Sequence, residues 1–569
     1  MGRTRKIAAG TVAEAYLALL KNRGIDRLFV NAGTDFAPIV EAYGRVPESG
    51  LDLPEVVVCA HENLAVSMAH GAHLAGGRPQ AVMLHTSVGT ANAVCGVLTA
   101  ARARVPLLVT AGRTPLFEDG APGARDAGIH WAQELYDQAG MLREFVKWDY
   151  ELRDGVQVET VVDRALDVAR TQPAGPVYLT LPRETLARPA YGVEVRDGPA
   201  APPVPASPNP DAVARLADHL AEARLPVIVT ASTGADPRTV PLLDDLCRRF
   251  SVGVVEHKPR FVNVPSANPL HLGFDLAPVL AEADVLCFLD VDVPWTPGSA
   301  RPRDEATVVQ CGPDPHFGAY PIRGHRSDLS ITTTPHALLT ALITALDERT
   351  STIDPDRHHQ IAETARHHAD RRRAALDTAA HTGGPIDKTF LNWAIGRVRP
   401  DDSVIVNEYW ARPDLLAGLE PGGYFGLPPD GGLGWGLPAA LGVRLARPDR
   451  TVIATLGDGS YMFANPAACH HAMRAHDLPV LTVIAANGRW AAVENSALTM
   501  YPEGHAAAST EVSAFARLDP IPEFEKYAEA SGGYGEHVTE RADLVPALRR
   551  GLRAVREERR PAVINVRCA

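Results

Sequence analysis

The chain has 569 residues, more than one hydrophobic core can organise, so its length predicts three or four domains. Its net charge of −12, from 56 basic and 68 acidic residues, disfavours nucleic acid and anionic membranes as partners. The seven cysteines form no C-x-x-C pair, which argues against a zinc site or a disulfide framework. No apolar run reaches transmembrane length and no signal-peptide core follows the N-terminus, so we expect a cytoplasmic protein.

The first third of the chain alternates short apolar runs with helical patterns. The runs are typical of buried parallel strands and lie at 27–30, 56–59, 81–84, 107–110 and 177–181. Helices are predicted between them, for example at 63–75 and 90–103. We therefore expect a doubly wound α/β domain over residues 1–190. A proline-rich linker, residues 197–208, follows it.

A second α/β domain is predicted over residues 191–350. Its strands are expected at 227–230, 253–256, 285–289 and 308–310. No G-x-G-x-x-G sequence follows its first strand, so nothing indicates FAD or NAD binding there. The charged stretch 347–381 is interpreted as a solvent-exposed helix that bridges domains. A metal site is the alternative for its histidines, although no carboxylate spacing supports it: His358, His359, His367 and His368.

A third α/β domain is predicted over residues 351–569, with strands at 404–406, 452–456 and 480–485. Between the last two strands, Asn465 followed by Pro466 predicts a helix start with an asparagine cap. The glycine-rich run 431–442 does not meet the dinucleotide spacing. All three domains are expected to be doubly wound parallel sheets, and no internal repeat is visible in residue identities.

Two polar residues follow neighbouring strands of the third domain. Asp458 comes just after the strand 452–456, and Asn487 just after 480–485. Both offer hard oxygen ligands at carboxyl strand ends, where α/β sheets bind ligands, so they suit Mg²⁺. Gly457 and Gly459 let the backbone approach a ligand, and nearby N–H groups can hold phosphate. The alternative interpretation is an ordinary Gly-Asp-Gly turn.

Four motifs in order extend this interpretation across nearly the whole chain. They are V-C-A-H-E-N at 58–63, L-H-T-S-V-G-T-A-N at 84–92, the glycine-rich run at 431–442, and residues 457–490. Together they resemble the thiamine diphosphate enzymes of the acetolactate synthase and benzoylformate decarboxylase group. The resemblance implies a pyrimidine-binding, a central and a diphosphate-binding domain. It also implies the cofactors thiamine diphosphate and Mg²⁺, and a homodimer or homotetramer with shared active sites.

The resemblance assigns site residues as well. Glu62 would hydrogen-bond the aminopyrimidine ring of the cofactor. The alternative role for Glu62 is that of an acidic residue in the first turn of a helix, which complements the helix dipole. Leu433 would support the bent cofactor, although ordinary core packing explains an apolar residue at this position equally well. The remaining implied contacts are Gly432, Gly457, Gly459, Ser460 and Trp490 around the cofactor, and Asp458, Asn487 and the Arg489 carbonyl on the metal. The family often has small hydroxyl residues where this chain has Tyr409 and Trp410.

His85 is the most informative residue for the substrate. It falls where benzoylformate decarboxylase carries an active-site histidine; the alternative is a histidine satisfied at a strand end. His130 lies where pyruvate decarboxylases carry a histidine pair, and the polar residue near Thr34 is a further candidate to line the same pocket.

The predicted function is an enzyme that makes or breaks a C–C bond next to a carbonyl. Its small-molecule substrate would be a 2-oxo acid, an acyloin or an aldehyde, handled by decarboxylation, by carboligation or by both. Two alternatives remain open here: a family member that binds cofactor without catalysis, and an NAD-dependent oxidoreductase.

Overall fold

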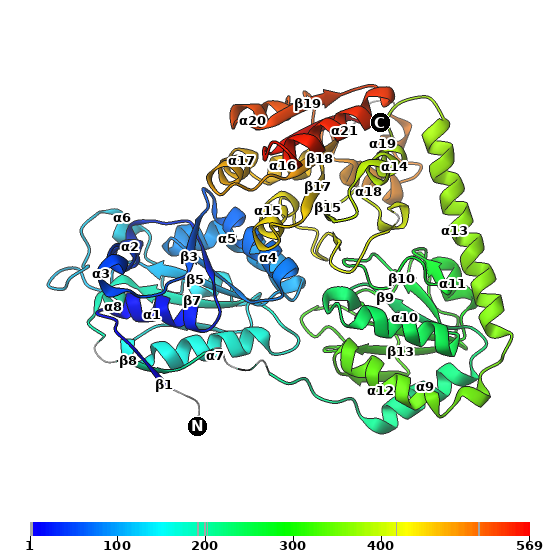
Figure 1. The fold of residues 1–569 in the computed structure, drawn as a ribbon, viewed down its shortest axis with the longest axis horizontal. Helices are drawn as coiled ribbons and strands as arrows, with labels where there is room; N and C mark the ends of the chain where they lie inside the picture. Colours follow the sequence, from blue (N-terminus) through cyan, green and yellow to red (C-terminus); the bar gives the residue numbers. More distant parts are fainter. Residues whose placement is uncertain (1–3, 191–192, 199–200, 202, 417, 510–512) are drawn as a thin grey trace.

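The structure, a computed structural model, describes residues 4–190, 193–198, 201, 203–416, 418–509 and 513–569. Figure 1 shows three lobes, and each is built on a six-stranded parallel sheet. These sheets confirm the predicted fold class, and the three ranges given for the domains remain a prediction. None of the described helices is both long and apolar enough to cross a membrane.

The N-terminal sheet has the strand order β3-β2-β4-β5-β7-β6. Its strands are β2 (Arg27–Val30), β3 (Glu55–Val58), β4 (Gln80–Leu84), β5 (Leu107–Arg113), β6 (Asp149–Glu151) and β7 (Val177–Pro182). Its helices are α1 (Val12–Asn22), α2 (Ala37–Gly44), α3 (Val46–Ser49), α4 (Glu62–Gly76), α5 (Thr86–Arg102), α6 (Ile129–Ala132), α7 (Val158–Arg170) and α8 (Arg183–Ala187). A separate antiparallel pair joins β1 (Thr4–Ile7) to β8 (Val193–Arg196).

The central sheet has the order β11-β10-β9-β12-β13-β14. Its strands are β9 (Pro226–Thr230), β10 (Gly253–Glu256), β11 (His271–Gly273), β12 (Val285–Leu289), β13 (Thr307–Gly312) and β14 (Leu329–Thr332). Its helices are α9 (Pro210–Glu222), α10 (Thr239–Phe250), α11 (Ala277–Glu282) and α12 (Pro335–Asp347). Within the linker, residues 199, 200 and 202 lie outside the described part, and the stretch 203–209 contains neither helix nor strand.

The C-terminal sheet has the order β16-β15-β17-β18-β20-β19. Its strands are β15 (Ser403–Glu408), β16 (Tyr424–Phe425), β17 (Thr451–Gly457), β18 (Leu481–Ala486), β19 (Tyr534–Val538) and β20 (Ala562–Arg567). Its helices are α14 (Lys388–Val398), α15 (Gly436–Ala446), α16 (Asp458–Phe463), α17 (Pro466–Ala475), α18 (Ala491–Met500), α19 (His505–Ala508), α20 (Glu525–Ala530) and α21 (Arg541–Arg556).

The N-terminal and C-terminal sheets share one topology. Numbered within each sheet, their strands run in the order second, first, third, fourth, sixth, fifth, whereas the central sheet runs third, second, first, fourth, fifth, sixth. The repeat is therefore present in topology although no residue-identity repeat was visible. One hydrophobic core spans both sheets, with α4, α5 and α15 contributing between them.

The bridging helix is α13 (Arg357–His381), which runs along the edge of the molecule beside the central and C-terminal lobes (Figure 1). Most of it is exposed, as predicted, but its first residue is buried. The Arg357 guanidinium donates to the carbonyls of Leu220, Ala223 and Phe250 at 2.9, 2.7 and 2.6 Å. Among the described residues, no three His, Cys, Asp or Glu side chains come together as a metal-binding group.

One local prediction was wrong. Helix α17 begins at Pro466 as expected, but the Asn465 side chain makes no capping hydrogen bond. The backbone of Asn465 is left-handed, with φ of 52°. Only two residues separate α16 from α17, so the chain must turn sharply there, and asparagine tolerates this conformation better than most residues.

Candidate active site

Glu62 stands at the start of α4, just beyond β3, and is 8% exposed. Its Oε2 accepts a hydrogen bond from Nδ2 of Asn92 on α5 at 3.1 Å, and none of the described residues donates to its Oε1. A methyl group at Gly89 would lie 3.4 Å from that Oε1, so glycine there leaves room beside the carboxylate. Glu62 is thus a buried carboxylate with one oxygen free for a ligand.

His85 follows β4 directly and contacts a residue that the sequence interpretation missed. Its Nδ1 lies 2.5 Å from Oδ1 of Asp35, which is 3% exposed. The hydrogen bond to Asp35 raises the pKa of His85, burial opposes this rise, and the charge of Glu62 adds to it. A polar residue near Thr34 was predicted to line this pocket; Thr34 itself is exposed, whereas the adjacent Asp35 is buried against His85.

His130 lies in α6 and is 3% exposed. Burial lowers the pKa of its imidazole, and the positive charges of Arg183 and His85 lower it further. Its Nδ1 accepts from the backbone N–H of Asp126 at 3.3 Å, whereas its Nε2 has no partner. Glu62, His85 and His130 therefore share one region, which we name, together with Asp35, the N-terminal half-site.

Asp458 joins the ends of two neighbouring strands in the C-terminal sheet. Its Oδ1 accepts from the N–H of Gly459 at 2.8 Å, and its Oδ2 accepts from the N–H groups of Asn487 and Gly488 at 3.0 and 2.7 Å. Burial raises the pKa of Asp458, and these backbone donors oppose the rise. The Asn487 side-chain oxygen accepts from the backbone N–H of Arg489 at 3.1 Å.

Trp490 covers the Gly-Asp-Gly turn. A methyl group at Gly459 would lie 2.1 Å from the Trp490 ring, so only glycine permits this contact. Ser460 is buried in the first turn of α16. We name Leu433, Asp458, Ser460, Asn487 and Trp490 the C-terminal half-site.

Glu408, at the end of β15, is a second residue that the sequence interpretation missed. It is fully buried, and its carboxylate accepts from the N–H groups of Gly434 and Gly436 at 2.8 and 2.5 Å. Burial raises its pKa to about 7, and the Ser460 side chain is one of the groups that oppose the rise. Glu408 thereby holds the backbone directly after Gly432 and Leu433, at the residues before and after Trp435.

Tyr409 and Trp410, which stand where the family often has small hydroxyl residues, follow Glu408 directly. Trp410 is buried, and its Nε1 donates to the Leu456 carbonyl at 2.8 Å, so it belongs to the core of the C-terminal sheet. Tyr409 is half-exposed with a left-handed backbone, φ of 94°.

Within one chain, Glu62 and the glycine-rich loop contact helix α5 at different points. Glu62 contacts α5 at Asn92, whereas the glycine-rich loop contacts α5 at Thr99, whose hydroxyl donates to Asp430 at 2.8 Å. Seven residues of helix separate these contacts, about 10 Å at 1.5 Å per residue. No hydrogen bond or ion pair in the described part of the chain joins Glu62, His85 or His130 to Asp458 or Asn487.

The two half-sites lie in two parts of the chain that match known protein-family models. Residues 10–141 match the model of the thiamine pyrophosphate enzyme N-terminal TPP binding domain, and residues 416–566 match the C-terminal TPP binding domain. The first range contains the N-terminal half-site and the second contains the C-terminal half-site. The chain belongs to the thiamine diphosphate-dependent enzymes.

Similar proteins cover this thiamine diphosphate-dependent enzyme almost end to end. Benzoylformate decarboxylase of Pseudomonas aeruginosa is 29% identical over 98% of both chains. Sulfoacetaldehyde acetyltransferase of Rhodobacter capsulatus is 27% identical over 95% of this chain and 92% of its own. Acetolactate synthase isozyme 3 large subunit of Escherichia coli is 24% identical over 96% and 93%.

Solved structures show that the fold is shared as well. The thiamine diphosphate-dependent 4-hydroxybenzoylformate decarboxylase of Rhodococcus jostii superposes with a TM-score of 0.77, at 23% identity over 98% of this chain and 99% of its own. Benzoylformate decarboxylase of Polynucleobacter necessarius gives 0.78 at 21% identity, over 99% of both.

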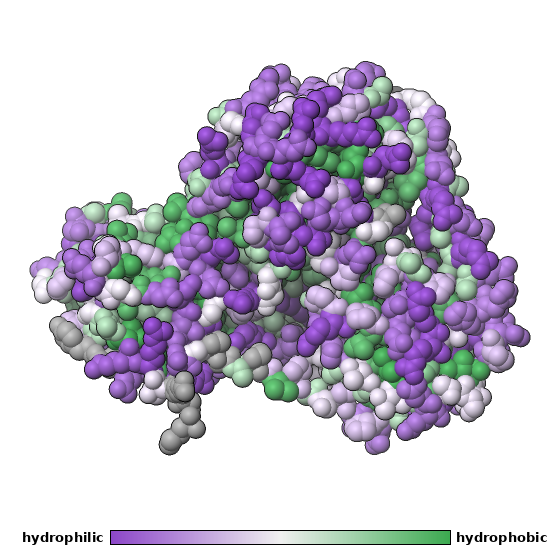
Figure 2. Space-filling view, in the orientation of Figure 1, coloured by the Kyte–Doolittle hydropathy of each residue, from purple (hydrophilic) through white to green (hydrophobic). Residues whose placement is uncertain are grey.

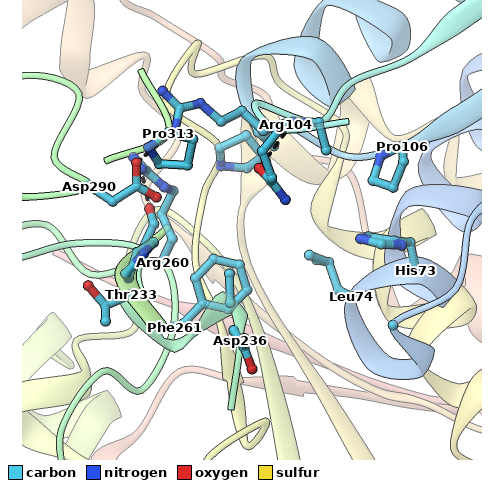
Figure 3. A pocket seen from close by; sticks show the side chains of 18 of the residues that line it. His73, Leu74, Arg104, Pro106, Thr233, Asp236, Arg260, Phe261, Asp290 and Pro313 are labelled. Carbon is cyan, nitrogen blue, oxygen red and sulfur yellow. Dashed lines mark hydrogen bonds and ion pairs between the residues drawn. The ribbon is translucent and has the colours of Figure 1, made fainter. Parts of the chain in front are cut away.

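A cavity of about 360 Å³ in this thiamine diphosphate-dependent enzyme lies away from both half-sites, where the three lobes meet. Figure 3 shows Arg104, Asp290 and Arg260 on one side of it and His73 on the other. Its cations already have partners, because Arg104 pairs with Asp290 at 2.7 Å and Arg260 with Asp292 at 3.3 Å. The cavity contains none of the predicted site residues.

Proposed function

We propose that this enzyme uses thiamine diphosphate and Mg²⁺ to decarboxylate a 2-oxo acid, and that it can also join the product fragment to an aldehyde. The observation that carries this proposal is the placement of His85 beside Glu62 at the carboxyl edge of the N-terminal sheet. When bound, thiamine diphosphate supplies a nucleophilic carbon and an electron sink for the pair left by a departing carboxylate. The relatives named above include both decarboxylases and acyl-transferring enzymes, so both outcomes belong to the proposal.

The N-terminal half-site contains three side chains that can hold or exchange a proton: Glu62, His85 and His130. The free Oε1 of Glu62 can exchange a proton with a ring nitrogen of the cofactor. His85 holds a proton on Nδ1 against Asp35, which leaves Nε2 to contact a substrate carboxylate or carbonyl. His130 stays neutral at neutral pH because its pKa is lowered, and its partnerless Nε2 can act as a hydrogen-bonding group.

The C-terminal half-site fits a magnesium diphosphate. Asp458 is a buried carboxylate with no cationic side chain among its described partners, and a buried charge requires a counter-charge. Its carboxylate, the Asn487 side-chain oxygen and the Arg489 carbonyl would hold Mg²⁺, a hard-oxygen donor set. The backbone of Gly457 and Gly459 and the Ser460 hydroxyl would contact the diphosphate, while Gly432, Leu433 and Trp490 would surround the rest of the cofactor.

A second copy of the chain would complete each site. Exposed hydrophobic side chains lie on elements next to both half-sites: Val88 and Trp131 in the N-terminal domain, and Met462 and Phe463 in the C-terminal domain. Figure 2 shows hydrophobic side chains at the surface between these two lobes. We propose a homodimer or homotetramer in which the N-terminal half-site of one chain meets the C-terminal half-site of another.

All seven cysteines are free thiols, which supports a cytoplasmic location.

Product analysis tests the reaction. The holoenzyme is incubated with aryl- and alkyl-substituted 2-oxo acids, with and without an aldehyde acceptor, and products are identified by mass spectrometry. We expect one CO₂ and one aldehyde for each 2-oxo acid consumed, and a 2-hydroxy ketone when acceptor is present. Glu62→Gln should abolish both products, while Glu55→Gln, on the exposed end of β3, should keep them. Absence of any product across the panel from cofactor-loaded protein would refute the proposal.

A substitution at His85 tests its role in the reaction. His85→Ala should lower turnover by roughly 10²–10⁴-fold, the effect of losing an acid–base group, with cofactor affinity nearly unchanged. His537→Ala, at an exposed position of β19, is the control and should retain turnover. Unchanged turnover in His85→Ala would assign this histidine to packing.

A further inference from the structure

Asp35 is a buried carboxylate whose ionic partner is a histidine. It lies in the 3-10 turn Thr34–Phe36 after β2, and its Oδ1 meets Nδ1 of His85 at 2.5 Å. Its Oδ2 accepts from the backbone N–H of Thr86 at 3.4 Å. No arginine or lysine in the described residues forms an ion pair with Asp35. A buried aspartate needs a counter-charge, and here the imidazole is the group that can provide it.

Two glycines make room for this pair. A methyl group at Gly112 would lie 1.7 Å from Oδ2 of Asp35, and one at Gly33 would lie 2.2 Å from the His85 ring. Thr86, which follows the histidine as the first residue of α5, has a left-handed backbone with φ of 38°, which is unfavourable for a β-branched residue. Three departures from ordinary residue choice or geometry therefore surround one carboxylate–imidazole contact, as expected where a side chain must be held in one position.

The contact decides which ring nitrogen faces the site. A carboxylate only accepts hydrogen bonds, so Nδ1 of His85 must donate to Asp35. Its Nε2 then points to the opposite side, where the amide nitrogen of Gln133 lies 3.4 Å away and can donate to it while the ring is neutral. In the imidazolium both atoms are donors, so the Gln133 amide must turn to present its oxygen, which has no partner among the described residues. The His85 side chain is 15% exposed while Asp35 is 3% exposed, so Nε2 is the end that a substrate can reach.

We propose that Asp35 is a positioning residue that holds the Nδ1–H of His85 and thereby fixes the ring orientation, which presents Nε2 to the 2-oxo acid, as a hydrogen-bond donor to its carboxylate when the ring carries both protons. This inference rests on the proposed function, because it assigns His85 to the substrate. The charged groups that face His85 are Asp35 from the turn after β2, Glu62 from α4 and His130 from α6. The two carboxylates favour the imidazolium, and a charged His130 would oppose it.

The sign of the pH effect follows from these contacts. Asp35 raises the pKa of His85, so the imidazolium persists to higher pH than in a free histidine, whose pKa is about 6.5. Removing the Asp35 charge should move the His85 titration to lower pH. If the imidazolium binds the substrate carboxylate, the decline of kcat/KM at high pH should move in the same direction.

The test uses holoenzyme labelled with ¹⁵N in the histidine rings. The His85 signals are assigned by their loss in His85→Gln, and ring shifts are followed against pH without substrate. We expect a titration above the ordinary value of about 6.5 and, in the neutral form, a proton on Nδ1. A titration at or below that value, or a neutral form protonated on Nε2, would overturn the inference. This readout needs no turnover, so it stands apart from a failure of the proposed function.

Variants then link the contact to activity. Asp35→Asn should move the His85 titration to lower pH and lower kcat/KM by about 10- to 100-fold, the effect typical of groups that orient a functional histidine. Asp126→Asn removes an exposed carboxylate beside His130 and should leave the His85 titration unchanged. In a His85→Gln background, Asp35→Asn should add no further loss. A further loss of kcat/KM of the same size in that background would show that Asp35 affects activity by stabilising the fold and not by positioning His85.

Discussion

Asp458 is the residue on which the C-terminal half-site depends. Three backbone N–H groups converge on its carboxylate from the ends of β17 and β18. A carboxylate has about four lone-pair sites, so one remains for a metal ion. The burial of this charge, without a cationic side chain as partner, is the physical reason to place Mg²⁺ there.

Asp458→Ala should abolish Mg²⁺-dependent binding of thiamine diphosphate, because the metal loses its one carboxylate ligand. Isothermal titration calorimetry of the stripped protein, with and without Mg²⁺, measures this. Asp449→Ala is the control, because Asp449 is an exposed aspartate whose ion pair among the described residues is with Arg447, and this variant should bind cofactor as the wild type does. Unchanged cofactor affinity in Asp458→Ala would remove this residue from the site.

The residues missed by sequence interpretation share one property. Asp35 and Glu408 each lie in an unremarkable local sequence, and their roles come from partners 50 and 26–28 positions away. The proximity of Asp458 and Asn487 could be predicted because both follow recognisable buried strands, whereas their role as metal ligands stays a prediction. A lone carboxylate after a strand carries no such signal until the fold brings its partner beside it.

At the scale of elements, the buried strands were predictable because parallel strands covered on both faces are continuous apolar runs. The range 285–289 coincides with β12, and 27–30 with β2. Strand β6 was missed because it has three half-buried residues and no apolar pattern. The shared topology of the outer sheets was missed because strand order leaves no trace in residue identities.

The close crossing of α4 and α15 joins the two cofactor-binding domains within one chain. Gly71 faces the Ala439 carbonyl, and Gly442 faces the Met68 carbonyl; a methyl group at either position would lie 2.0 or 1.9 Å from those oxygens. The clash involves backbone atoms of rigid helices, so it can be relieved only by moving one helix away from the other.

Gly71→Ala should therefore destabilise the enzyme by about 1–3 kcal/mol, the usual cost of overpacking, although alanine normally stabilises a helix relative to glycine. Gly76→Ala in the same helix is the matched control. Its methyl group would make an ordinary contact of 3.8 Å with Ala446, so it should stabilise slightly. Thermal unfolding of both holoenzymes measures the effect, and a midpoint for Gly71→Ala equal to that of Gly76→Ala would contradict the crossing.

At the scale of the whole molecule, each chain carries two half-sites, and no hydrogen bond or ion pair among the described residues joins Glu62, His85 or His130 to Asp458 or Asn487. The residues of α5 that contact Glu62 and the glycine-rich loop lie two helical turns apart. Exposed hydrophobic side chains lie near both half-sites. The proposed pairing of two chains would let each N-terminal half-site face a C-terminal half-site of the other chain. Closure by the partner would also exclude water from the reacting groups.

Subunit exchange tests this central claim most directly. Glu62→Gln chains and Asp458→Ala chains are each expected to be inactive, because each loses one half of every site. In a mixed dimer, one site carries both changes and the other carries neither. CO₂ release from a 2-oxo acid should therefore reappear after exchange, at about half the wild-type value for each mixed dimer, on the arithmetic of one intact site in two. Verified mixed dimers that stay inactive, while wild-type chains survive the same treatment, would contradict the account.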